Sequence, residues 1–143
     1  MLIDARGKAL LCDFGFSRIR HEVTRTHTRI REGGQTRFLA PELTLGQKEK
    51  FRTTQESDIY SLAMTFLALV ALASPFAEYD NEYAAMNAAQ RGIRPQRPEF
   101  STFPKDTVDQ LWCFMERMWD KEPSERPIAS DVELFVGGLI NGD

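Results

Sequence analysis

The stretch Leu10-Leu11-Cys12-Asp13-Phe14-Gly15 is an apolar run that ends in an acid, an aromatic residue and a glycine, and Ala40-Pro41-Glu42 follows further along the chain. Taken alone, Asp13-Phe14-Gly15 is a weak signal, because Asp-x-Gly is ordinary turn chemistry. The same tripeptide followed by Ala-Pro-Glu is a far rarer coincidence. These two motifs frame the interpretation of the other segments.

Length and composition indicate one folded domain. The chain has 143 residues, of which 42% are apolar and 27% charged, as in ordinary globular proteins. A net charge of −3 gives no general attraction to nucleic acid or to a membrane surface, so neither is expected as a partner. The apolar run 62–73 is shorter than the roughly twenty residues that span a bilayer, and it predicts a buried helix. The first residues resemble a strand rather than a signal peptide, which favours an intracellular protein, cytoplasmic or nuclear.

The cysteines give no metal or disulfide pattern. Cys12 and Cys113 are far apart, and each has apolar neighbours. We predict two reduced, buried thiols, although the sequence leaves a disulfide possible.

The front of the chain predicts a hairpin and then a polar loop. Residues 2–4 and 8–12 flank Ala5-Arg6-Gly7, which favours a β-hairpin. Thr24, Thr26 and Thr28 then alternate with other residues in an arginine-rich stretch. Two interpretations stay open: a solvated loop, or a loop whose threonines are phosphorylated and whose arginines hold the phosphate.

Four helices are expected after this loop. The first runs over 59–73, is apolar nearly all round, and has Ser57 or Asp58 as cap or first-turn acid. The others are predicted over 81–91, over 107–119 with amphipathic spacing, and from 128 to about 136, where Gly137-Gly138 closes the helix. The pattern predicts a mainly α domain with a short hairpin at its N-terminal edge.

Four features occur in an order that resembles the C-terminal lobe of eukaryotic protein kinases. They are Asp13-Phe14-Gly15, Ala40-Pro41-Glu42, Asp58 at the start of an apolar helix, and Glu125-Arg126-Pro127. The resemblance covers essentially the whole chain. It implies a β-hairpin over 1–12, an activation segment over 13–42 and a helical lobe over 43–143. Gly34 to Glu42, with Trp119, is similar to tyrosine-kinase-like or fungal serine/threonine members.

The resemblance also implies a nucleotide site. In the family, the Asp of Asp-Phe-Gly coordinates the Mg²⁺ ions that bridge the phosphates of ATP, and Asp13 is the match. Phe14 resembles the apolar plug whose packing distinguishes active from inactive states, and Gly15 allows the turn. Leu2 resembles the floor of the adenine pocket, a role compatible with that of a core leucine.

Structural roles follow from the same resemblance. Glu42 and Arg126 are similar to a buried ion pair that ties the activation segment to the helical lobe; each alone would be taken for a surface charge. Asp58 resembles the acid that holds the catalytic-loop backbone, with helix capping as the alternative. Thr36 joins Thr24, Thr26 and Thr28 as a candidate residue of the activation segment.

Parts of the kinase pattern are missing from these 143 residues. There is no glycine-rich loop, no strand Lys and no His-Arg-Asp…Asn motif, so no catalytic residue is present. We therefore expect this chain alone to be inactive and to bind ATP and Mg²⁺ weakly or not at all. Gln35 stands where serine/threonine kinases usually have Thr, which makes protein serine/threonine phosphorylation by a parent kinase less secure, though still favoured over tyrosine.

Two functions remain open at this stage. The chain can be a fragment of an active kinase whose partner is a protein substrate. It can also be a non-catalytic, pseudokinase-like module that binds another kinase's lobe or a regulator.

Overall fold

A computed structural model describes residues 2–10, 12, 36–44, 53–99 and 104–141. They belong to two compact units, residues 1–31 and residues 32–143, and each unit is described by itself.

The first unit contains the predicted hairpin. Strand β1 (Leu2–Ile3) pairs antiparallel with β2 (Ala9–Leu10). The Asp4 carboxylate stabilises the turn, because it accepts a hydrogen bond of 2.8 Å from the backbone N–H of Lys8. Gly7 has a φ of 80°, a left-handed conformation that glycine adopts without a steric penalty.

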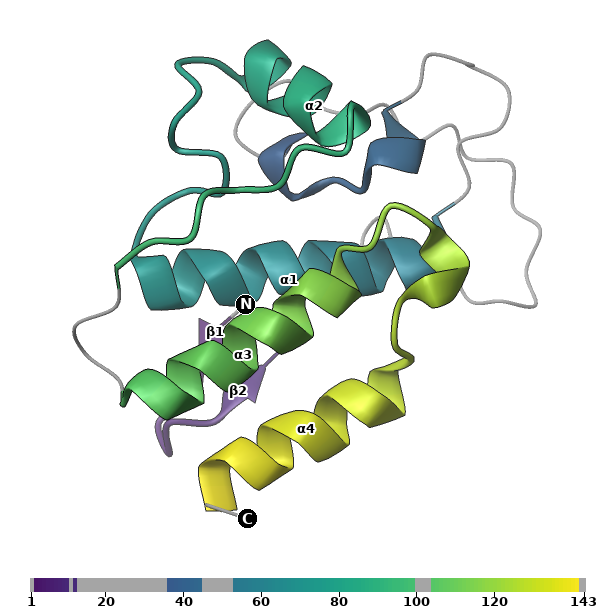
Figure 1. The fold of residues 1–143 in the computed structure, drawn as a ribbon. Helices are drawn as coiled ribbons and strands as arrows, with labels where there is room; N and C mark the ends of the chain where they lie inside the picture. The colour runs from purple at the N-terminus through teal and green to yellow at the C-terminus, as the bar shows by residue number, and fades with distance from the viewer. Residues whose placement is uncertain (1, 11, 13–35, 45–52, 100–103, 142–143) are drawn as a thin grey trace. The chain divides into compact units, whose positions relative to one another are not determined.

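The second unit is helical within its described residues. Its α-helices are α1 (Gln55–Ala71), α2 (Glu82–Gln90), α3 (Lys105–Met118) and α4 (Ala129–Asn141), and its short 3-10 helices are η2 (Thr36–Phe38), η3 (Pro41–Leu43) and η4 (Pro123–Glu125). Helix α1 lies between α2 with the 36–44 segment on one side and α3 on the other (Figure 1). The prediction of a mainly α fold is confirmed.

Helix α1 begins at a capping box. The Thr54 side chain accepts from the Ser57 N–H at 3.2 Å, and the Ser57 hydroxyl accepts from the Thr54 N–H at 2.9 Å. The cap is therefore Thr54, not Ser57 or Asp58. Asp58 is a first-turn acid, whose negative charge interacts favourably with the positive end of the helix dipole.

Only part of the α1 surface is buried, contrary to the expectation of burial all round. Tyr60, Ala63 and Met64 are fully enclosed, whereas Leu69 is 52% exposed. The helix ends at Ala71 because Leu72 takes a left-handed φ of 51°. The hydrophobic run thus predicted the helix correctly but did not predict how much of its surface is buried.

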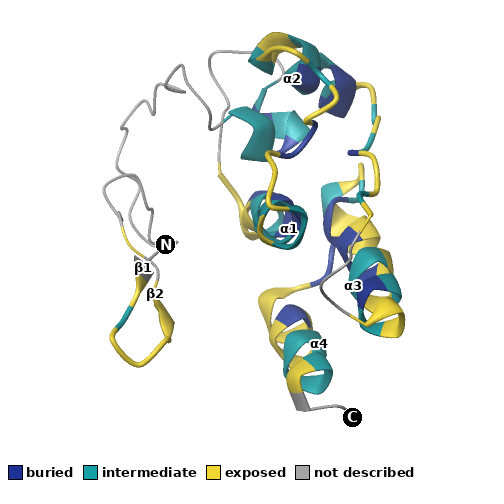
Figure 2. Cartoon of the chain, turned by 90° about the vertical axis from the view of Figure 1, so that its left-hand side faces the viewer, coloured by how far each residue is buried: buried dark blue, intermediate teal, exposed yellow. Residues whose placement is uncertain are grey.

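The main core lies between α1 and α3, and Figure 2 shows their buried positions gathering where these helices face one another. The periodicity of α3 is confirmed: Val108, Met115 and Met118 are buried. Trp119 follows, is 1% exposed, and meets Trp112 edge-on at 5.3 Å between centroids.

The predicted end of the last helix is wrong. Helix α4 continues through Gly137 and Gly138 to Asn141. Glycine costs a helix about 1 kcal/mol relative to alanine, a penalty too small to stop a helix flanked by the half-buried Val136 and Leu139.

The cysteine prediction is also wrong in part. Cys12 and Cys113 are free thiols, as expected, but both are exposed. For Cys113 the reason is that neighbours along a helix, here α3, point in different directions, so its apolar neighbours did not place it in the core.

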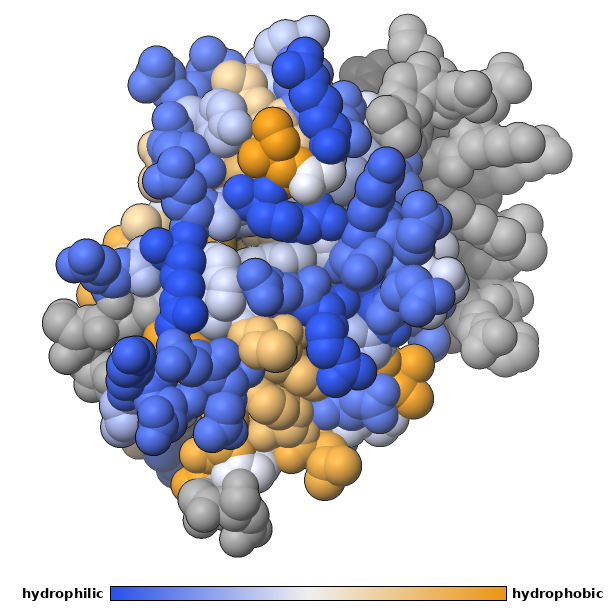
Figure 3. All heavy atoms as spheres, in the orientation of Figure 1, coloured by the Kyte–Doolittle hydropathy of each residue, from blue (hydrophilic) through white to orange (hydrophobic). Residues whose placement is uncertain are grey.

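The surface is mainly hydrophilic on the face shown in Figure 3, with apolar side chains gathered over the α4 region. Leu134 and Ile140 of this helix are 79% and 78% exposed. Among the described helices, none is both long and apolar enough to cross a membrane.

Candidate functional site

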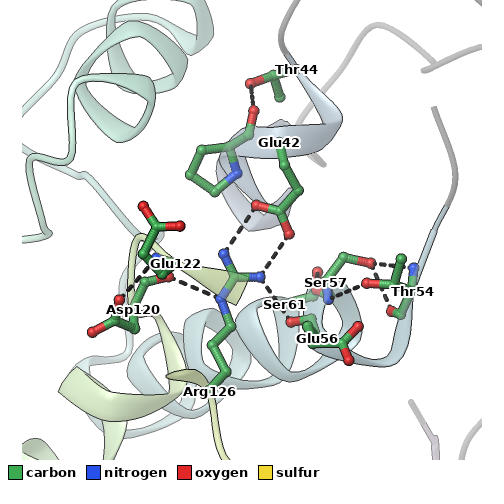
Figure 4. Close-up of polar contacts among 10 residues, drawn as sticks. Glu42, Thr44, Thr54, Glu56, Ser57, Ser61, Asp120, Glu122 and Arg126 are labelled. Atoms are coloured by element: carbon green, nitrogen blue, oxygen red, sulfur yellow. Dashed lines mark hydrogen bonds and ion pairs between the residues drawn. The ribbon is translucent and has the colours of Figure 1, made fainter. Parts of the chain in front are cut away.

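Arg126 is the centre of a polar site that joins three parts of the helical unit. Its guanidinium binds both oxygens of Glu42, with Nη1–Oε1 at 2.6 Å and Nη2–Oε2 at 3.0 Å. It also donates to the backbone carbonyls of Glu56 at 2.9 Å and Asp120 at 2.9 Å. One side chain thus joins η3, the start of α1 and the loop after α3 (Figure 4).

Local structure brings Glu42 and Arg126 into position. Pro41 opens the 3-10 turn η3 that carries Glu42, and Ala40 before it is fully buried. Pro123 opens η4, whose last turn ends at Arg126 with an N–H···O bond of 3.2 Å to Pro123. Fixed proline φ angles pre-organise both short turns.

The pair is only partly removed from water. The Arg126 side chain is 0% exposed and that of Glu42 is 31% exposed. The arginine therefore lies inside the protein, while the carboxylate keeps contact with solvent. The buried Arg126 guanidinium depends on these hydrogen bonds, because burying a charged group without partners would cost much free energy.

A second layer surrounds Arg126. The Tyr60 ring lies 5.2 Å from its Cζ in a cation–π arrangement. Burial raises the pKa of Tyr60 to about 12. Burial also lowers the pKa of the neighbouring Arg94. Within the described residues, the Tyr60 hydroxyl and Arg94 Nη1 are buried without a hydrogen-bond partner.

Asp58 is placed one turn into α1. The residue is exposed to solvent as a whole, yet partial desolvation by neighbouring protein atoms raises the pKa of its carboxyl group. No hydrogen bond joins that carboxyl group to another described residue, and the backbone N–H of Asp58 donates to the Thr54 carbonyl at 3.1 Å. Its expected role toward a catalytic loop stays a prediction.

The other predicted site residues are distributed as follows. Leu2 lies in β1, and Thr36 lies in η2, where its hydroxyl donates to Glu82. Outside the described residues are Asp13, Phe14, Gly15, Thr24, Thr26 and Thr28. No group of three His, Cys, Asp or Glu side chains able to hold a metal ion occurs in the described part of the chain.

Sequence reasoning missed Tyr60, Arg94 and Arg37. The first two border the Arg126 site, and Arg37 makes a separate set of contacts with α2. Nothing in their residue types signals these roles, because their partners are distant in sequence or are backbone carbonyls.

Comparison with known proteins gives a consistent assignment. The model of the protein kinase domain family matches residues 1–133. A probable serine/threonine-protein kinase of Dictyostelium discoideum is 31% identical over 97% of this chain and 14% of its own length. The serine/threonine-protein kinase STY17 of Arabidopsis thaliana is 26% identical over 98% of this chain and 22% of its own length. A dual serine/threonine and tyrosine protein kinase of Bos taurus is 26% identical over 99% of this chain and 14% of its own length.

The chain therefore spans less than a quarter of each of these relatives. The match includes Asp13-Phe14-Gly15, Ala40-Pro41-Glu42 and Arg126. The chain belongs to the protein kinase family.

Proposed function

We propose that residues 1–143 form the C-terminal lobe of a protein kinase domain. The proposed boundaries are a hairpin over 1–12, an activation segment over 13–42 and a helical lobe over 43–143. The observation that carries this proposal is the bidentate contact of Arg126 with Glu42. It fastens the end of the proposed activation segment to the helical core, which is the role that the family resemblance assigns to these residues.

The proposed reaction is transfer of the γ-phosphate of ATP to a serine or threonine hydroxyl of a protein substrate, with tyrosine less favoured. Relatives named as serine/threonine and dual-specificity kinases support this class. The proposed subtype, tyrosine-kinase-like or fungal serine/threonine, rests on the sequence from Gly34 to Glu42 and on Trp119. A need for ATP is consistent with an intracellular location, in the cytoplasm or the nucleus.

Asp13 and Leu2 are the proposed nucleotide-site residues. A carboxylate at position 13 would supply oxygen to Mg²⁺, a hard cation that prefers such ligands. The bound ion would neutralise charge on the phosphates during transfer. Leu2 would offer an apolar surface to the adenine ring. Thr24, Thr26, Thr28 and Thr36 are the proposed threonines of the activation segment.

Residues 1–143 in isolation are proposed to be inactive. They contain neither the base nor the phosphate-binding Lys of the kinase pattern, and phosphoryl transfer depends almost wholly on positioning and electrostatics. A longer protein that supplies these parts would be the active form.

Phosphate transfer from labelled ATP to a generic protein substrate tests both statements. A longer protein that contains this chain should lose at least about 100-fold of its rate on Asp13→Asn, because the change removes one metal ligand. The transfer rate of the isolated chain should not exceed that of the Asp13→Asn variant of the longer protein. Transfer by the isolated chain above its own Asp13→Asn form would contradict the proposed inactivity. Absence of transfer by both the longer protein and its variant would favour the non-catalytic binding module instead.

A further inference from the structure

Helix α2 is joined at both ends to the 36–44 segment, which lies far from it in sequence. The first residue of the helix, Glu82, contacts Thr36 and Arg37, and its last residue, Gln90, contacts Thr44. The helix therefore runs beside the segment and is tied to the two ends of it (Figure 1).

Arg37 makes the first of these joints. Its Nε donates to Glu82 Oε1 at 2.7 Å. Its two Nη groups donate to the carbonyls of Pro75 at 3.1 Å, of Phe76, and of Tyr79 at 2.9 Å. The side chain is 10% exposed, so these bonds form with little competition from water.

Glu82 completes this joint from the helix side. One of its carboxylate oxygens accepts from Arg37 and the other from the Thr36 hydroxyl. The hydrogen bonds from Thr36 and Arg37 lower the pKa of this carboxyl group. Glu82 is therefore ionised at neutral pH and already paired, although its side chain is 40% exposed.

Gln90 makes the second joint. Its Nε2 donates to the Thr44 carbonyl at 3.1 Å and to the Thr44 hydroxyl oxygen at 2.9 Å. Thr44 directly follows η3, the turn that carries Glu42. Arg126 thus binds the turn η3 through Glu42, and α2 binds the residue after this turn through Gln90.

Apolar packing contributes less to the position of α2 than to that of α1. The buried residues of α2 are Ala85, Ala88 and Ala89, which are small and remove little apolar area from water. A helix of nine residues is also marginal on its own. The two polar joints therefore provide a large share of what holds α2 in place.

We infer that α2 is a brace for the 36–44 segment, and that Arg37 is the positioning residue that sets where this segment lies. The inference rests on the proposed function and extends it in one respect, which is that 36–44, at the end of the proposed activation segment, also receives the protein substrate. Because the guanidinium reaches one carboxylate and three carbonyls at once, no other side chain can replace it, lysine included.

Hydrogen exchange of the 143-residue chain tests the brace without any activity. Arg37→Ala and Arg37→Lys should each raise exchange in 36–44 and 82–90 by about 10-fold, with α1 and α3 unchanged. Arg97→Ala is the matched control, because Arg97 pairs with Asp109 at the surface with 41% and 45% side-chain exposure, and it should change neither region. Unchanged exchange in the two Arg37 variants, or an equal increase throughout the chain, would overturn the inference.

A double variant tests whether Arg37 acts through Glu82. Glu82→Ala should raise exchange in the same two regions as Arg37→Ala, and the increase in the double variant should be less than the sum of the two single effects. Fully additive effects would show that the two residues act separately and would overturn the joint.

Steady-state kinetics of a longer, active protein test the substrate part. Arg37→Ala should raise the KM for a protein substrate at least about 5-fold while the KM for ATP stays within about twofold. Equal changes in both constants would overturn the assignment of Arg37 to substrate positioning. A longer wild-type protein without activity would contradict the proposed function. Hydrogen exchange would still test, independently of activity, whether α2 and Arg37 hold the 36–44 segment in place.

Discussion

Substitution of Arg126 by alanine should destabilise the chain strongly. The variant loses the bidentate contact with Glu42 and two bonds to backbone carbonyls, and it leaves a space beside the buried Tyr60 ring. Breaking a buried ion pair costs about 3–5 kcal/mol. Because Glu42 is 31% exposed and can be hydrated after the change, we expect the low end, about 3 kcal/mol.

A loss of about 3 kcal/mol corresponds to a fall in the melting temperature of roughly 10 °C for a domain of this size. Differential scanning calorimetry or thermal circular dichroism measures it. Arg97→Ala is again the control, since an exposed pair contributes at most about 1 kcal/mol. A melting temperature of Arg126→Ala within about 2 °C of that control would refute the argument that this pair ties the segment to the core.

Two further predictions concern pH and helix α4. Since burial raises the pKa of Tyr60 from 10.0 to about 12, the unfolded state ionises first as pH rises. The free energy of unfolding should therefore fall between about pH 10 and pH 12, by about 2–3 kcal/mol; urea denaturation at several pH values measures this, and a Tyr60→Phe variant that loses as much would contradict it. Gly138→Ala should raise the free energy of unfolding by up to about 1 kcal/mol, because an added Cβ would meet nothing within 4 Å; a lower melting temperature would show that the helix needs glycine there.

Strongly periodic segments were predictable from sequence. The apolar spacing of α3 gave a helix over 107–119, and the structure has Lys105–Met118. The hairpin was found because Gly7 provides the left-handed turn that the strands require. Such features depend on neighbours within a few residues, and those neighbours are visible in the sequence.

Boundaries and exposure were less predictable, because they depend on backbone geometry and on packing partners. Thr54 caps α1 through a reciprocal contact with Ser57, whereas the sequence suggested Ser57 or Asp58. Cys113 is exposed although its neighbours Phe114 and Met115 are buried. A helix turns successive residues by about 100°, so apolar neighbours do not predict burial.

The site residues divide in the same way. The Glu42–Arg126 contact could be expected only from the resemblance to protein kinases, since the two residues are 84 positions apart. Arg37 escaped notice because three of its acceptors are backbone carbonyls, which every residue possesses. Side-chain identity carries no information about such partners.

The separation of Glu42 and Arg126 has a consequence for the order in which the domain assembles. Closing a loop of 84 residues costs the chain about 4 kcal/mol of entropy, from 1.5 RT ln n. The link is therefore expected to form after the local helices, once η3 and α1 are already close together. A contact that forms late is absent from the folding transition state, so its loss should appear as faster unfolding rather than slower folding. The ion pair would then set how long the domain stays folded, more than how quickly it folds.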